Sequence, residues 1–336
     1  MNWISNARIV AIFSVVCLHI AAYAVLNAEL GTANWWSGNL YDAATRWCVP
    51  VFVMVSGALL LEPRPQEGMK LFYRKRAAKV LMPLLFWTAF YLGWTAFKQH
   101  WWTPEADPYP YLERLLQGRP YFHLWFLYMI VFLYLFTPFL RRMVQNTNLK
   151  QLAALTGAAF VLSALSTLSN PDLNTHSAPF FTWFLSYLPY FLLGYLLRKV
   201  PVQVPRWLTI TVLLSSIAAT AWGFYALTMT HDRQTGAYFY DYLSVTVIPM
   251  SIALILLLRD WNRPLLNPRI SAHLAELTLG VYLIHPWLID LMYRYLFTAL
   301  DFNALWSIPV LAVAIYGLSL LLTAGFKAMP GLRATV

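Results

Sequence analysis

Charged side chains are scarce in this sequence. Only 11% of its 336 residues are Asp, Glu, Lys or Arg, whereas 60% are hydrophobic and 17% are aromatic. A soluble domain carries about 25% charged residues, so this chain has too few to cover a water-facing surface. The composition therefore predicts an integral membrane protein, with Trp and Tyr at the interfaces of the bilayer.

Cysteine is also rare, and familiar motifs of soluble enzymes are missing. The two cysteines, Cys17 and Cys48, lie in apolar segments, which excludes a disulfide framework and a four-ligand zinc site. The sequence has no GxSxG, HExxH or P-loop pattern. A metal site built from His19, His123 and His285 would lack an acidic or thiolate ligand nearby, so no metal is expected.

Apolar runs long enough to cross a bilayer recur along the whole chain. A helix needs ~20 apolar residues to span the hydrocarbon core, and ten segments meet or approach this length. They are residues 4–27, 40–61, 78–98, 122–140, 150–168, 180–198, 206–228, 241–258, 272–294 and 303–326. The predicted fold is an all-α integral membrane protein, a bundle of about ten transmembrane helices. The first segment has no basic region before it, so we expect a retained span and not a signal peptide.

The basic residues fall mainly on one side of this topology. Ten spans place both termini on the same side. With residues 1–6 in the cytoplasm, seventeen of the 24 Lys and Arg lie in cytoplasmic connections or the tail, against five on the opposite side. This positive-inside bias predicts cytoplasmic termini and accounts for most of the net charge of +10 without nucleic-acid binding.

The connections between the predicted spans are short. The longest, between residues 98 and 121, is expected to contain one short helix, Tyr111–Gln117, and no connection exceeds about 25 residues. Residues 1–336 are therefore predicted to form a single transmembrane domain with no appended soluble domain.

The first predicted span contains two side chains that are costly in a bilayer. Arg8 and His19 are eleven residues apart, which at ~100° per residue places them on one face of the helix and ~16 Å apart along its axis. An ionisable side chain in a span costs about 2.5–3.5 kcal/mol and is by default a functional candidate. The pair is either a snorkelling arginine with a packed histidine, or a polar groove with a cation near the cytoplasm and a base deeper in the membrane.

The second predicted span also carries a cation. Asp42 and Arg46 are four residues apart and can form an ion pair on the helix surface. Pro50 is expected to kink the helix and free backbone carbonyls, and Ser56 with Gly57 to permit close contact with a neighbouring helix. Packing alone explains Ser56 and Gly57 but not Arg46.

The ninth predicted span adds a second deep histidine. His285 is predicted at a depth similar to that of His19 and Arg46, on a third helix. Glu276 lies nearer the cytoplasm in the same span and could partner Arg8.

Two further features lie at the ends of spans. His123, at the start of the fourth span, fits the membrane interface as well as a functional site. The loop FYRKRAAKVLMP contains Arg74 and Arg76. It suits either anionic lipid headgroups or a phosphate group from the cytosol.

Together these segments resemble the acyltransferase-3 family of integral-membrane O-acyltransferases. Six blocks match its motifs in family order: ARIVAIFSVVCLHI, RWCVPVFVMVSGALL, FYRKRAAKVLMP, FHLWFLY, LPYFLLGYLL and LGVYLIHP. The chain is most similar to the small stand-alone members that O-acetylate surface polysaccharides, of the enterobacterial common antigen type. The family often has an acid three residues before Arg8, where this chain has Ser5.

The resemblance implies an O-acyltransferase of the bacterial cytoplasmic (inner) membrane. Such an enzyme moves an acetyl or other short acyl group from cytosolic acyl-CoA to a sugar hydroxyl of an extracytoplasmic or lipid-linked glycan. Acetyl-CoA would be a co-substrate, with no permanently bound cofactor, and the partners would be the glycan and membrane lipids, without nucleic acid. The alternative function is a transporter of a polar or lipid-linked solute, since buried Arg and His also mark permeation paths.

The resemblance also implies residue roles. His19 would be the general base, with an acyl-histidine intermediate left open, and Arg46 or His285 would stabilise the oxyanion or orient the sugar. Four residues would bind the acyl-CoA donor: Arg8, Arg74, Arg76 and Glu276. Arg8 could instead hold the groove together. Four more residues belong to the acceptor site or to structural motifs: Ser56, His123, Trp125 and Tyr282.

Overall fold

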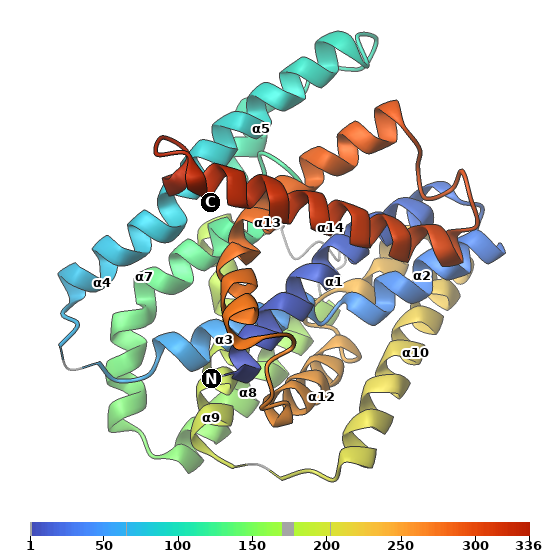
Figure 1. Cartoon of the computed structure of the whole chain (residues 1–336). Helices are drawn as coiled ribbons and strands as arrows, with labels where there is room; N and C mark the ends of the chain where they lie inside the picture. Colours follow the sequence, from blue (N-terminus) through green and yellow to red (C-terminus); the bar gives the residue numbers. More distant parts are fainter. Residues whose placement is uncertain (1, 65, 170–177, 202) are drawn as a thin grey trace.

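The chain forms a bundle of long helices with shorter helices in the connections (Figure 1). The computed structural model describes residues 2–64, 66–169, 178–201 and 203–336, and within these ranges it contains no β-strand, which confirms the predicted all-α class. The helices in chain order are α1 (Asn2–Asn27), α2 (Ala33–Thr45), α3 (Cys48–Leu60), α4 (Met69–Arg76), the π-helical turn η1 (Ala77–Leu81), α5 (Met82–Trp101), α6 (Tyr111–Leu116), α7 (Trp125–Asn146), α8 (Leu149–Ser169), η2 (Phe180–Thr182), α9 (Trp183–Lys199), α10 (Arg206–Thr230), α11 (Arg233–Gly236), η3 (Ala237–Tyr240), α12 (Val247–Asp260), α13 (Pro268–Tyr295), α14 (Ala304–Ala328) and η4 (Arg333–Thr335).

Nine segments of the described chain are long and apolar enough to cross a membrane. They are α1, α2–α3, α4–α5, α7, α8, η2–α9, α10, α13 and α14. The eighth predicted span corresponds to α12, which has only 14 residues and is therefore about 21 Å long, shorter than the ~30 Å hydrocarbon core. Its expected start at residue 241 is wrong because Asp241 and Ser244 accept hydrogen bonds from the backbone N–H groups of Leu243 and Val247, which makes turns there.

Both termini lie at the same end of the bundle. Asn2 donates a hydrogen bond to the carbonyl of Asn262, just before α13. Lys327, near the end of α14, donates to the carbonyl of Glu276 in the first half of α13. Helix α12 is not among the nine segments long enough to cross a membrane, so the described chain does not bear out the predicted tenth crossing. That this end is cytoplasmic stays a prediction from the charge distribution.

The second span is broken into α2 and α3 at Arg46 and Trp47. The break lies four residues before Pro50, whose missing N–H and bulky ring prevent a helical bond to the Arg46 carbonyl. The kink expected at Pro50 is thus a complete break between two helices. Arg46 therefore lies between the two helices, inside the bundle.

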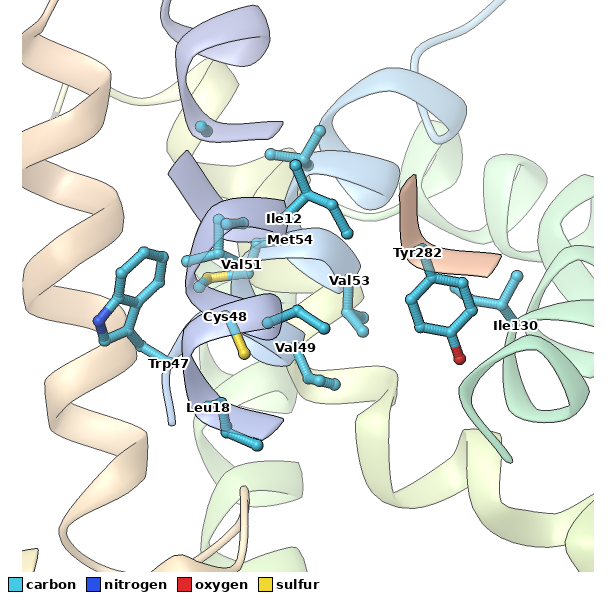
Figure 2. Packing of buried hydrophobic residues seen from close by; sticks show 14 of the residues in the cluster. Ile12, Leu18, Trp47, Cys48, Val49, Val51, Val53, Met54, Ile130 and Tyr282 are labelled. Atoms are coloured by element: carbon cyan, nitrogen blue, oxygen red, sulfur yellow. The ribbon is translucent and has the colours of Figure 1, made fainter. Parts of the chain in front are cut away.

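Helices α3 and α9 touch backbone to backbone in the core. A Cβ atom on Gly57 would lie 1.8 Å from the carbonyl oxygen of Phe191, and one on Gly194 would lie 1.9 Å from that of Met54. The two glycines therefore allow a reciprocal close approach, as predicted for Gly57. Figure 2 shows side chains from α1, α3, α7 and α13 meeting in the apolar cluster beside this contact.

Candidate active site

Three histidine rings from distant parts of the sequence lie against one another. His19 of α1 stacks on His285 of α13, with ring centroids 5.2 Å apart and planes 21° apart. His123, in the turn that leads into α7, lies edge-on to His285 at a centroid distance of 5.8 Å. The first contact confirms the expected common depth of His19 and His285. His123 is only 2% exposed and belongs to the same cluster, so its side chain is enclosed by the protein.

Several ring nitrogens of this cluster have no hydrogen-bond partner. Nδ1 of His285 lies 3.0 Å from the carbonyl oxygen of Val281, whereas its Nε2 is buried and unpartnered among the described residues. Both nitrogens of His123 are likewise unpartnered in the described chain, although its carbonyl accepts a hydrogen bond from the Tyr282 hydroxyl. Because buried polar groups are nearly always hydrogen-bonded, these nitrogens are available to a bound molecule.

A small cavity adjoins the histidine cluster. Its volume is about 30 Å³, which holds one or two water molecules. The lining residues come from α1, α3, the start of α7, the turn before α12 and α13: Val15, Leu18, His19, Cys48, Val49, Phe52, His123, Trp125, Phe126, Tyr242 and Tyr282. Any molecule larger than water therefore needs these walls to move before it can reach the rings.

Arg8 and His19 both face α13, as their spacing predicts. The Arg8 guanidinium donates to Thr278 Oγ1 at 2.9 Å, and His19 meets His285 further along. Glu276 is exposed and forms no direct ion pair with Arg8 in the described structure, although its charge acts on the Arg8 guanidinium. Positions that are two residues apart on a helix point ~200° away from each other. Because Thr278 faces α1, Glu276 must therefore face away from it.

Arg46 is held by its own helix and by the turn before α12. It forms the predicted ion pair with Asp42 at 2.5 Å, with the two side chains 15% and 1% exposed. Its guanidinium also donates to the carbonyl of Tyr240 at 3.1 Å and lies 4.1 Å from the centroid of that ring. Arg46 does not line the cavity beside His19, but its charge acts on the His19 ring. Its catalytic role therefore stays a prediction.

A basic cluster lies at the end of the bundle that carries the termini. The ring of Phe72, fully buried, is covered by the guanidinium groups of Arg76 at 5.6 Å and Arg141 at 4.8 Å. Arg74, by contrast, is exposed. No sequence pattern distinguishes Arg141 from other basic residues that follow a span and serve topology. The Arg141 side chain is buried because it packs on the Phe72 ring and donates a hydrogen bond to the carbonyl of Leu60, at the end of α3.

Glu67 neutralises part of this cluster. Its carboxylate lies 3.1 Å from Lys75 Nζ and 3.0 Å from Arg141 Nη1. Burial raises the pKa of Glu67, but the hydrogen bonds and charges of Lys75 and Arg141 outweigh it, so the pKa is lowered overall. The carboxylate therefore occupies positions where a phosphate group would also be held.

The remaining candidates divide between the cavity and the packing around it. Trp125 lines the cavity and stacks on Tyr242 at a ring-centroid distance of 5.8 Å. Ser56 Oγ lies 3.2 Å from the Tyr134 hydroxyl, between α3 and α7. Within the described ranges, no three His, Cys, Asp or Glu side chains are arranged to hold a metal ion.

Comparison with known proteins identifies the family. The family model described as an acyltransferase domain, acyltransferase-3, matches residues 1–324. The searches of curated proteins and of solved structures found no match. Since the family model covers nearly the whole chain, the chain belongs to the acyltransferase-3 family and is a multi-pass membrane acyltransferase.

Proposed function

We propose that this acyltransferase moves an acetyl or other short acyl group from cytosolic acyl-CoA to a sugar hydroxyl of an extracytoplasmic or lipid-linked glycan. The enzyme would lie in a bacterial cytoplasmic membrane and act as a surface-polysaccharide O-acetyltransferase. The observation that carries the proposal is the His19 ring, which lines a cavity inside the bundle and stacks on His285. A base inside the bundle suits a reaction whose substrates arrive from opposite sides of the membrane.

The proposed reaction needs one base and no bound cofactor. The sugar hydroxyl oxygen attacks the thioester carbonyl carbon while the His19 imidazole accepts the hydroxyl proton. The carbon–sulfur bond then breaks, and the departing CoA thiolate takes that proton from His19, so the ester and free CoA are the products. The unpartnered Nε2 of His285 and the nitrogens of His123 are hydrogen-bonding groups for the acceptor or the oxyanion.

Arg8 supports a route for the donor from the end that carries the termini. It lies eleven residues before His19 on the same face of α1, which is ~16 Å along the helix. A flexible pantetheine arm of that order of length could join a phosphate held near Arg8 to a thioester beside His19. Arg76 and the exposed Arg74 offer a second phosphate-binding surface.

The alternative function, transport of a polar or lipid-linked solute, receives less support. The family whose model matches the chain is one of acyltransferases. A transporter would move its solute without consuming acyl-CoA, whereas a transferase leaves an ester on the acceptor.

The test is acyl transfer by the purified protein in nanodiscs. Labelled acetyl-CoA and candidate glycans are supplied, and ester formation is measured for wild type and His19→Ala. Loss of transfer by at least about 100-fold is expected for His19→Ala, in the range that general-base catalysis contributes. His273→Ala is the matched control, because His273 is an exposed histidine on α13 and should retain activity. Full transfer by His19→Ala would refute the assignment of the base.

A further inference from the structure

Phe122 is the exposed member of a segment that is otherwise buried. Tyr121 is 8% exposed and His123 2%, whereas Phe122 between them is 52% exposed. Its ring lies edge-on to His19, with centroids 4.9 Å apart and planes 71° apart. One exposed aromatic ring therefore stands in direct contact with the proposed base.

The segment around Phe122 is firmly anchored on both sides. The Tyr121 hydroxyl donates to Asp290 at 2.5 Å and accepts from Lys98 at 2.8 Å, and its ring stacks on Tyr91 at 4.3 Å. On the other side, the carbonyl of His123 is held by the Tyr282 hydroxyl. These contacts fix the backbone, so the outward position of Phe122 is imposed by the fold.

The segment lies at the end of the bundle opposite the termini. It follows the connection that leaves α5, and Trp102 at the start of that connection donates a hydrogen bond to Tyr295, the last residue of α13. The first half of α13 is near the termini, since Glu276 contacts Lys327. Phe122 thus approaches His19 from the side on which an extracytoplasmic acceptor would arrive.

We propose that Phe122 is the stacking platform of the acceptor-sugar subsite, an inference that rests on the proposed transfer to a glycan. The C–H bonds on one face of a sugar ring carry partial positive charge, and the face of an aromatic ring is negative. A hexose stacked on Phe122 would present an equatorial hydroxyl at its edge to His19. Which hydroxyl is acylated would then follow from which sugar face lies on the ring.

An exposed phenylalanine in a membrane protein has an ordinary explanation, contact with lipid tails. The two explanations predict different substitutions. Lipid contact requires only apolar volume, so Phe122→Leu should behave as wild type. Sugar stacking requires a π face, so Phe122→Leu should weaken acceptor binding and Phe122→Trp should retain it.

The experiment uses the full chain in nanodiscs with two acceptor probes and labelled acetyl-CoA. Octyl β-glucoside presents hydroxyls on a sugar ring, and triethylene glycol monooctyl ether presents a hydroxyl on an equally long amphiphile without one. For Phe122→Leu we expect the KM for the glucoside to rise about tenfold, as for loss of one aromatic stacking contact. The KM values for the ether and for acetyl-CoA should not change, and Phe122→Trp should restore the glucoside KM.

The control variant is Phe302→Leu, since Phe302 is 60% exposed and packs only against Phe297 among described aromatic rings. Equal glucoside kinetics in wild type and Phe122→Leu would overturn the subsite while leaving the proposed function intact. An equal rise in KM for both probes would also overturn it, because the contact would then recognise the alkyl chain. Failure of wild type to acetylate either probe or any glycan would instead contradict the proposed function.

Discussion

The buried ion pair between Asp42 and Arg46 allows a test of whether Arg46 acts in structure or in catalysis. The pair is short, at 2.5 Å, and its side chains are 1% and 15% exposed. Two unit charges whose centres are ~4 Å apart attract by about 4 kcal/mol at an effective dielectric constant of ~20. Removing one partner of a buried pair costs about 3–5 kcal/mol, because the other charge is left buried and uncompensated.

We therefore expect Asp42→Asn and Arg46→Met each to destabilise the protein by about 3–5 kcal/mol. The double variant should be less destabilised than either single variant, because neither charge then remains unpaired. Thermal unfolding in detergent, followed by tryptophan fluorescence, ranks the four proteins. The double variant should melt above both single variants and below or near wild type.

Asp260→Asn is the matched control for this cycle. Asp260 also lies beside an arginine, Arg259 at 3.7 Å, but is 73% exposed, so its replacement should cost no more than about 1 kcal/mol. Additive effects of the two substitutions would refute the coupling. A fall in kcat for Arg46→Met at unchanged melting temperature would show instead that Arg46 stabilises the oxyanion.

Three further outcomes are expected. Gly57→Ala should destabilise the protein by about 1–3 kcal/mol or more, as overpacked cores do, because its Cβ would clash with an α9 carbonyl; an unchanged melting temperature would contradict the close contact. Arg8→Ala should raise the KM for acetyl-CoA about 10–100-fold with kcat retained, as for one lost charge-assisted hydrogen bond; unchanged KM with lowered stability would indicate that Arg8 only holds helices together. The pKa of Glu67 is lower in the folded protein than the ~4.3 of an unfolded chain. Its contacts with Lys75 and Arg141 therefore stabilise the fold fully at pH values above ~4.3, and this stabilisation is lost as the pH falls through the lowered pKa. Glu67→Gln should therefore lower the melting temperature at pH 7 and approach wild type in acid, and a pH-independent difference would refute this.

Local pattern was a reliable guide to the helices and to contacts within them. The apolar runs predicted the crossings, because a span must satisfy its backbone hydrogen bonds internally whatever its neighbours are. The Asp42–Arg46 pair followed from the spacing of four residues. The break before Pro50 followed from the missing N–H. Each of these depends on residues within one turn or two of the chain.

Contacts between helices could be predicted less well from the sequence. Helical phase correctly placed Arg8 and His19 on one face, but it could not select Thr278 over Glu276 as the partner of Arg8. The rotation of α13 about its own axis decides which of its residues faces α1. In the same way, hydrogen bonds of Asp241 and Ser244 to local backbone shortened α12 although the segment is apolar.

The sequence by itself determined the membrane environment, nine of the ten predicted spans and the two polar residues of the first span, because composition, hydropathy and helical period are properties of the chain alone. Only the tertiary structure decided that His123 joins His19 and His285, that Arg46 also contacts Tyr240, and that Phe122 faces outward beside the proposed base. The physical reason is that these positions are set by how α1, α7 and α13 pack. Residues more than one hundred positions apart come together there, and no local period encodes their distance.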